Sequence, residues 1–110
     1  MKKFIALYKA PVDAMANAGN ATKEEQAAAM QAWLTWRDNN LENIVDFGAP
    51  LLPGNNLNGN GAWQATPSEI GGYSILQGES SEAVQALFKD HPHLNWVPGC
   101  SIELQECKVM

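Results

Sequence analysis

Two histidines beside an acidic residue are the side chains best suited to proton transfer in this 110-residue chain. They lie in the segment Asp90-His91-Pro92-His93, at the predicted C-terminus of a helix. A helix C-terminus raises the pKa of a nearby histidine, and Asp46 or Asp90 would orient the ring. We therefore expect His91 or His93 to act as a general base or acid. The structural alternative is that His91 caps the helix and His93 packs in the following loop.

The same histidines do not predict a metal site, because no third ligand is near them in the sequence. Cys100 and Cys107 are the only cysteines and lack the spacing of zinc ligands. If residues 100–107 form a strand, the two thiols point to opposite faces and cannot form a disulfide. We expect no metal, no cofactor, and reduced thiols in a cytoplasmic protein.

Aromatic side chains and one arginine predict the walls of a small-molecule cleft. Trp33 and Trp36 share a helix face, and Arg37 lies one turn from Trp33, where it can hold an anionic group. Tyr73 can donate from a strand into the same cleft, and Trp96 follows the histidines in a loop. The alternatives are that the tryptophans and Tyr73 pack in the core and that Arg37 pairs with a nearby carboxylate.

Composition and motifs exclude several classes of function. The formal net charge is −5, with 12 acidic and 7 basic residues, so no basic stripe is available to neutralise nucleic-acid phosphates. No apolar run approaches the roughly 20 residues that span a bilayer. The chain has no GxSxG or HExxH motif, and Gly71-Gly72 lacks the context of a phosphate-binding loop.

The elements that position these residues follow the order β, long α, β, β, α, β. A capping box at Thr22 and Glu25 begins the long helix, and its apolar stripe includes Met30. The expected elements are a strand at 3–8, a loop at 12–21, a helix from Thr22 to about Val45, a strand at 46–52 entered through Gly48, an exposed loop at 53–61, a strand at 70–77, a helix from Ser80 or Ser81 to Asp90, and a strand at 100–107. The sequence leaves open whether the 12–21 loop acts as a lid.

Short right-handed connections turn this order into an α+β, ferredoxin-like βαββαβ domain that spans residues 1–110. Its four-stranded antiparallel sheet has two helices on one face. The strands carry too much apolar surface for the other face to be solvated. We therefore expect a homodimer in which two sheets meet.

Several segments resemble the YCII-related family, and together they cover nearly the whole chain. They are Ile70-Gly71-Gly72-Tyr73-Ser74-Ile75-Leu76, Ser81-Glu82-Ala83-Val84, Asp90-His91-Pro92-His93-Leu94, Cys100-Ser101-Ile102-Glu103-Leu104, the Trp33 to Trp36 stretch and Gly48-Ala49-Pro50-Leu51. The resemblance implies a dimeric α/β barrel of ferredoxin-like subunits.

The chain departs from the family at two places. A large branch has Asp-Gly-Pro-Phe before the third strand, where this chain has the segment 61–69. The founding branch pairs a histidine of the first helix with an aspartate at the exit of the second. Here the first helix has no histidine, and His91 precedes the exit proline.

The function that we expect is cofactor-free acid/base chemistry on a small organic molecule, in a cleft between the sheet and the long helix. The alternative is a non-catalytic dimer that binds a small metabolite, and the sequence leaves open whether the protein is an enzyme.

Overall fold

The computed structural model describes residues 1–17 and 20–110. In chain order the helices and strands are β1 (Lys2–Lys9), α1 (Val12–Ala16), α2 (Lys23–Asn39), β2 (Ile44–Pro50), β3 (Gly54–Leu57), β4 (Trp63–Thr66), β5 (Ile70–Gly78), α3 (Ser81–Gln85) and β6 (Ser101–Glu106). The described residues also form the 3₁₀ turns η2 (Leu41–Asn43), η3 (Ala86–Phe88) and η4 (Pro92–Asn95).

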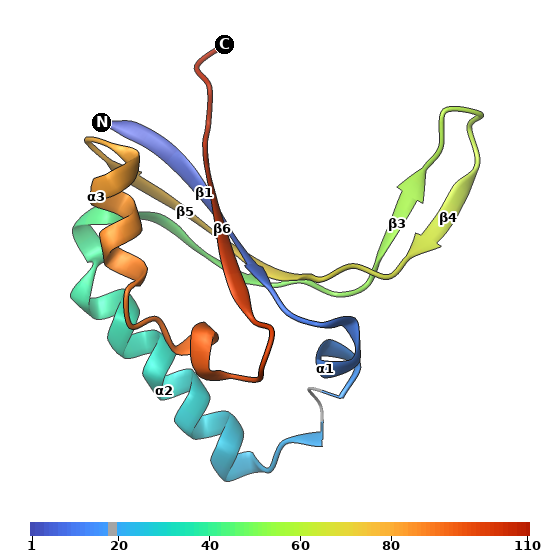
Figure 1. The fold of residues 1–110 in the computed structure, drawn as a ribbon, viewed down its shortest axis with the longest axis horizontal. Coiled ribbons are helices and arrows are strands. Elements are labelled where there is room, and N and C mark those ends of the chain that lie inside the picture. Colours follow the sequence, from blue (N-terminus) through green and yellow to red (C-terminus); the bar gives the residue numbers. More distant parts are fainter. Residues whose placement is uncertain (18–19) are drawn as a thin grey trace.

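The main sheet has four antiparallel strands in the order β2-β5-β1-β6. The first and third strands of the βαββαβ unit are therefore central, as the two-sided apolar character of residues 3–8 indicates. In Figure 1, α2 and α3 lie on the same side of this sheet. The predicted ferredoxin-like α+β fold is confirmed.

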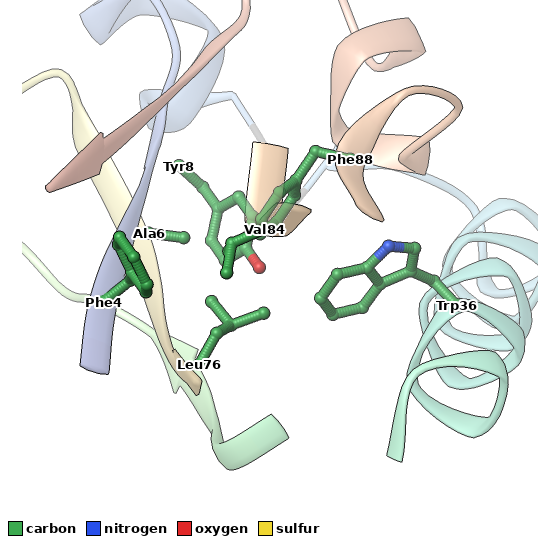
Figure 2. Packing of buried hydrophobic residues seen from close by; sticks show 7 residues of the cluster. All are labelled: Phe4, Ala6, Tyr8, Trp36, Leu76, Val84 and Phe88. Atoms are coloured by element: carbon green, nitrogen blue, oxygen red, sulfur yellow. The ribbon is translucent and has the colours of Figure 1, made fainter. Parts of the chain in front are cut away.

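The core lies between the sheet and the helices. Phe4, Ala6 and Tyr8 alternate along β1 and are buried, as is Leu76 on β5. Figure 2 shows these side chains facing those of the helical layer, among them Trp36. Because strand side chains alternate between faces, the odd-numbered residues of β1 and β5 must lie on the opposite side of the sheet.

The long helix begins as the sequence predicts and ends earlier. The capping box is present, with the Glu25 amide donating to Thr22 Oγ1 at 3.1 Å and the Thr22 amide donating to Glu25 Oε1 at 3.2 Å. The expected continuation to Val45 is wrong, because α2 ends at Asn39 and Ile44 already begins β2. Met30 is 56 % exposed and is therefore not part of a buried stripe.

Gly48 does not follow the helix as a C-terminal cap but lies within β2. Its φ is +83°, and an added Cβ would lie 1.8 Å from the carbonyl oxygen of Tyr73. The register of β2 against β5 shifts on both sides of Asp46. The glycine therefore permits a bulge in this edge strand.

The loop expected at residues 12–21 is in part the short helix α1, and residues 18–19 of that prediction lie outside the described residues. Proline at position 11 ends β1, and the following apolar and alanine-rich residues form one helical turn. Met15 of this turn packs against β5, where a Cβ at Gly71 would lie 2.7 Å from its Sδ atom. The absence of a side chain at Gly71 therefore allows Met15 to pack closely against the strand.

The turn-rich segment expected to be a loop forms part of a second, two-stranded sheet. In this β3–β4 hairpin, Gly54 pairs with Thr66 and Leu57 pairs with Trp63, and all residues of both strands are exposed. Figure 1 shows the hairpin projecting away from the main sheet and the helices.

In Figure 1, no helix of the described residues lies over the face of the main sheet opposite α2 and α3. Two cross-strand pairs, Ile5 with Ile75 and Leu7 with Tyr73, form its centre. We call these four residues the open face. No helix of the described residues is long and apolar enough to cross a membrane.

Candidate functional site

The two histidines lie in the turn that follows the second helical segment. Pro92 occupies the first turn of η4, where a missing amide hydrogen costs nothing, and His91 is the N-cap residue. The His93 backbone amide donates to His91 Nδ1 at 3.0 Å. His91 therefore caps η4, which follows it, and not the helix before it.

His93 is held by the first strand. Its Nε2 lies 2.7 Å from the carbonyl oxygen of Lys9, and its side chain is buried. A carbonyl oxygen only accepts hydrogen bonds, so Nε2 must carry the proton. In the neutral ring Nδ1 is then the nitrogen with a free lone pair, which is the form that a general base needs.

His91 has the opposite arrangement. A backbone amide only donates, so Nδ1 carries the lone pair and Nε2 carries the proton in the neutral ring. The side chain is 0 % exposed, and Nε2 is the one fully buried side-chain nitrogen or oxygen without a hydrogen-bond partner among the described residues.

Burial and, to a smaller extent, the neighbouring His93 together lower the pKa of His91 to about 3. The expectation that a helix C-terminus raises this pKa is wrong. The α-helical part before His91 is only the five residues of α3, and the ring is surrounded by aromatic side chains instead of carboxylates. His91 is therefore a neutral hydrogen-bond donor at physiological pH.

Tyr8 of β1 lies against both histidine rings. Its ring stacks on His91 at a centroid distance of 5.1 Å and an interplanar angle of 24°, and it meets His93 at 5.5 Å. The Tyr8 hydroxyl donates to Ser74 Oγ at 2.8 Å, and Ser74 donates to the Phe47 carbonyl oxygen at 2.6 Å. Burial raises the pKa of Tyr8 to about 12, and the bond to Ser74 opposes this shift.

Three of the predicted tryptophans contact the histidines, and one of them is Trp36 of the core, which lies 4.6 Å from the His91 ring. Trp33 of α2 contacts His91 at 4.4 Å in an edge arrangement and reaches His93 at 6.3 Å. Trp96 lies 6.2 Å from the His93 ring and is 43 % exposed, so it forms the solvent side of the group. We call His91, His93, Tyr8, Trp33 and Trp96 the histidine cluster.

The other predicted site residues do not join this cluster. Asp46 is exposed, and its carboxylate accepts the Gly48 amide at 2.8 Å, so it stabilises the bulge of β2. Arg37 pairs with Asp38 at 3.0 Å and lies 5.8 Å from the centroid of the Phe47 ring. Tyr73 lies on the open face, on the other side of the sheet from the histidines.

The cleft expected between the sheet and α2 is filled by aromatic rings. Trp33 of α2 lies 4.7 Å from the Tyr8 ring, and Figure 2 shows the rings of Tyr8, Trp36 and Phe88 in the core beside it. A groove of about 630 Å³ instead runs between α2 and residues 86–95. Its lining includes Trp36, Asn39, Leu87, Asp90 and Pro92. The groove therefore borders the segment that carries the histidines without containing either of their rings.

The arrangement can move a proton at His93 Nδ1 and donate a hydrogen bond from His91 Nε2. No group of three or more His, Cys, Asp or Glu side chains that could hold a metal ion occurs within residues 1–17 and 20–110. Cys100 and Cys107 are both free, as the spacing predicts.

Among solved structures, the chain is similar to 5-chloro-2-hydroxyhydroquinone dehydrochlorinase (TftG) from Burkholderia phenoliruptrix, in complex with 2,5-dihydroxybenzoquinone. The identity is 16 %, the TM-score is 0.50, and the match covers 94 % of this chain and 91 % of that one. No protein-family model matches the chain, and no curated protein matches it. The likeness supports the fold, and membership of the YCII-related family remains a prediction.

Sequence reasoning missed Tyr8 and Ser74. The alternation of side chains between the two faces of a strand identifies them. Leu76 belongs to the core, so Ser74, two residues away, lies on the same face, and Tyr73 lies on the other. On β1, Tyr8 shares the buried face of Phe4 and Ala6. Alternation counted from the core residues would therefore have selected Tyr8 in place of Tyr73.

Proposed function

We propose that the protein is a cofactor-free enzyme that transfers protons on a small planar organic molecule, with His93 as the base. The observation that carries this proposal is the 2.7 Å contact between His93 Nε2 and the Lys9 carbonyl oxygen. It fixes the ring and its tautomer and leaves Nδ1 as the basic atom. No cofactor is needed for this chemistry.

The reaction class that fits is proton transfer next to a carbonyl group. His93 Nδ1 takes a proton from the carbon beside the carbonyl, and the electrons of that C–H bond move toward the carbonyl oxygen to give an enolate. Return of the proton to a different atom completes an isomerisation. The flat rings of Tyr8, Trp33 and Trp96 favour a planar ligand.

The fold comparison supports a small oxygenated ring as the ligand. The similar structure is a dehydrochlorinase in complex with 2,5-dihydroxybenzoquinone. This ring is planar, and moving a proton from an enol oxygen to the neighbouring ring carbon gives a CH₂ group between two carbonyl groups, from which a base can remove either hydrogen. We take that compound as the first test ligand for this chain.

The test is the exchange of the ring hydrogens of 2,5-dihydroxybenzoquinone for deuterium, followed by proton NMR in D₂O. We expect the protein to accelerate the exchange. A His93→Gln variant keeps a side-chain donor for the Lys9 carbonyl oxygen but has no basic nitrogen, so the acceleration should fall about 100-fold or more. Lys89→Gln, an exposed change in the same region, is the control. No acceleration by the parent protein, or equal acceleration by His93→Gln, would contradict the proposal.

The second candidate is a non-catalytic protein that binds a small metabolite at the same cluster. One observation favours it: no hydrogen bond or ion pair among the described residues joins a histidine to a carboxylate. The base therefore lacks the acidic partner that Asp46 or Asp90 was expected to supply. Binding of the test ligand without any exchange of its hydrogens would support this second candidate.

We also propose that the protein is a homodimer joined through the open face. Ile5, Leu7 and Ile75 are partly exposed at the centre of the uncovered side of the sheet. A second copy can cover this surface sheet to sheet, in the manner of a dimeric α/β barrel. A cytoplasmic location also remains a prediction, based on the two free thiols.

A further inference from the structure

The buried Nε2–H group of His91 is the feature that the core does not explain. Nδ1 is occupied by the His93 amide at 3.0 Å, which leaves the proton on Nε2, and Nε2 has no partner among the described residues. A buried donor without an acceptor destabilises the folded state, because it has lost its hydrogen bond to water. Such a group in a native structure calls for a missing acceptor.

Within residues 1–17 and 20–110, aromatic rings surround this donor. Trp33 and Trp36 meet His91 edge to face, at centroid distances of 4.4 and 4.6 Å. Tyr8 and Phe88 lie beside the ring at 5.1 and 5.6 Å. An N–H group over an aromatic face is a weak hydrogen bond, so these contacts stabilise the donor less than an oxygen would.

We propose that His91 Nε2–H is a preformed, uncharged donor for an oxygen atom of a small planar ligand, either a carbonyl oxygen or an ionised phenol or enol. This inference rests on the proposed function, because Tyr8 and Trp33 contact both histidine rings. Since aromatic rings fill this space, the ligand reaches Nε2 by displacing one of them. The inference adds a binding partner for the ligand oxygen, whereas His93 interacts with the hydrogen that is removed.

The two histidines would then have separate roles. His93 accepts the proton, and His91 stabilises the oxygen on which negative charge develops without giving up its own proton. A neutral imidazole suits this role because a charged one would be destabilised by burial among these aromatic rings. The ligand class that follows is a flat molecule with a carbonyl or ionisable oxygen near an acidic hydrogen.

The first measurement is the tautomer of His91 and its response to 4-nitrophenolate, a planar anion with one ionised oxygen. In protein labelled with ¹⁵N histidine, long-range ¹H–¹⁵N spectra should show the proton on Nε2. Addition of 4-nitrophenolate should shift the Nε2–H resonance downfield. A proton on Nδ1, or an Nε2–H that is unchanged while the probe binds, would overturn the inference. An Nε2–H group that donates to a bound water, and keeps that water when the probe is added, would also overturn the inference.

Two substitutions separate the donor from the cap. His91→Asn places an acceptor near the position of Nδ1 and removes the Nε2 donor, so the cap of η4 persists while binding of 4-nitrophenolate weakens about tenfold. His91→Gln places an amide donor near the position of Nε2 and loses the cap, so binding should stay within about twofold at a lower stability. Equal affinity of His91→Asn and the parent would overturn the inference.

The proposed function can fail separately. Probe binding that depends on His91, together with no exchange activity that depends on His93, would leave a ligand site without catalysis. Failure of the parent protein to bind the probe at all would overturn this inference, whatever the exchange experiment shows.

Discussion

His91 and His93 have the same ring and opposite hydrogen-bond polarity, because a backbone amide holds one and a backbone carbonyl holds the other. The His93 backbone amide donates to Nδ1 of His91, which therefore carries no proton. The Lys9 carbonyl oxygen accepts from Nε2 of His93, which therefore carries one. Backbone groups cannot change these roles as side chains can. The pair is therefore differentiated by the fold itself, without any carboxylate.

The burial of His91 predicts a dependence of stability on pH. Its pKa is about 3 in the folded chain and about 6.5 in an unfolded one. Between these values the unfolded chain binds a proton that the folded chain does not, so stability falls as the pH is lowered from about 6.5 toward 3. The contribution has a slope of up to about 1.4 kcal/mol per pH unit.

Urea unfolding of the parent and of His91→Asn at several pH values between 4 and 7 checks this prediction. Carboxylates also titrate in part of this range, so the difference between the two proteins is the relevant quantity. We expect that difference to shrink as the pH falls, because only the parent loses the contribution of His91. A difference that is constant with pH would show that His91 titrates normally in the folded protein.

A second prediction at the scale of residues concerns Gly48. Gly48→Ala should lower the free energy of unfolding by about 3 kcal/mol, because φ is +83° and the new Cβ would lie 1.8 Å from the Tyr73 carbonyl oxygen. Gly54→Ala is the matched control, since a Cβ at that position would meet nothing within 4 Å. Denaturant unfolding of both variants measures the difference, and similar stabilities would show that the bulge can rearrange.

The sequence alone identified part of the histidine cluster and misassigned the rest. Four of the residues predicted for one site, His91, His93, Trp33 and Trp96, lie close together in the structure. Their role in binding or catalysis stays a prediction. The sequence selected Asp46 because a carboxylate often orients a histidine, yet the bulge directs that carboxylate to the Gly48 amide. The position of the Asp46 carboxylate depends on the bulge in the edge strand β2. The alternation of apolar and polar residues in the sequence does not predict where such a bulge occurs.

At the scale of elements, helix starts were better predicted than helix ends. The starts of α2 and α3 depend on one local side-chain bond each, from Thr22 and Ser80, and both are present. The end of α2 depends on competition with the sheet. Ile44 and its neighbour fit the apolar period of the helix, but Ile44 pairs with Leu76 of β5. Tertiary pairing therefore overrides the helical pattern beyond Asn39-Asn40, the pair of weak helix formers.

The β3–β4 hairpin predicts an unusual tolerance to deletion. All residues of both strands are exposed, although not completely, and Gly54 and Thr66 lie opposite each other at the base. A variant in which a two-residue Asn-Gly turn replaces residues 54–66 should therefore keep the fold, with a free energy of unfolding within about 0.5 kcal/mol of the parent value.

Circular dichroism and urea unfolding of this variant at low protein concentration test the prediction. A variant in which Trp63 and Leu57 are replaced by serine, with the hairpin length unchanged, is the control for the loss of exposed apolar side chains. A large loss of stability in the deletion variant alone would show that the hairpin supports β2 and β5.

At the scale of the whole molecule, the order of elements was sufficient to predict the topology. Two central strands that are apolar on both sides, two helices and short connections leave few alternatives to the order β2-β5-β1-β6. The inserted β3–β4 hairpin was not predicted, because its sequence of asparagine and glycine is typical of turns and its strands pair only with each other.

The two faces of the main sheet also differ in a way that the sequence of a single strand does not reveal. One side holds the core and the histidine cluster, and the other holds the uncovered Ile5–Ile75 and Leu7–Tyr73 pairs.

The open face gives the last prediction, which concerns assembly. Leu7→Glu would place a charge at the centre of the sheet-to-sheet contact, where burial of an unpaired carboxylate is strongly unfavourable. We expect the parent protein to sediment as a dimer and Leu7→Glu as a folded monomer, because Leu7 contributes nothing to the core on the helical side of the sheet. Gln31→Glu on the exposed surface of α2 adds the same charge and should leave the dimer intact. Analytical ultracentrifugation over a range of concentrations measures all three proteins. A parent that stays monomeric at every concentration would contradict the dimer. A dimer that survives Leu7→Glu would instead place the interface elsewhere, away from the open face.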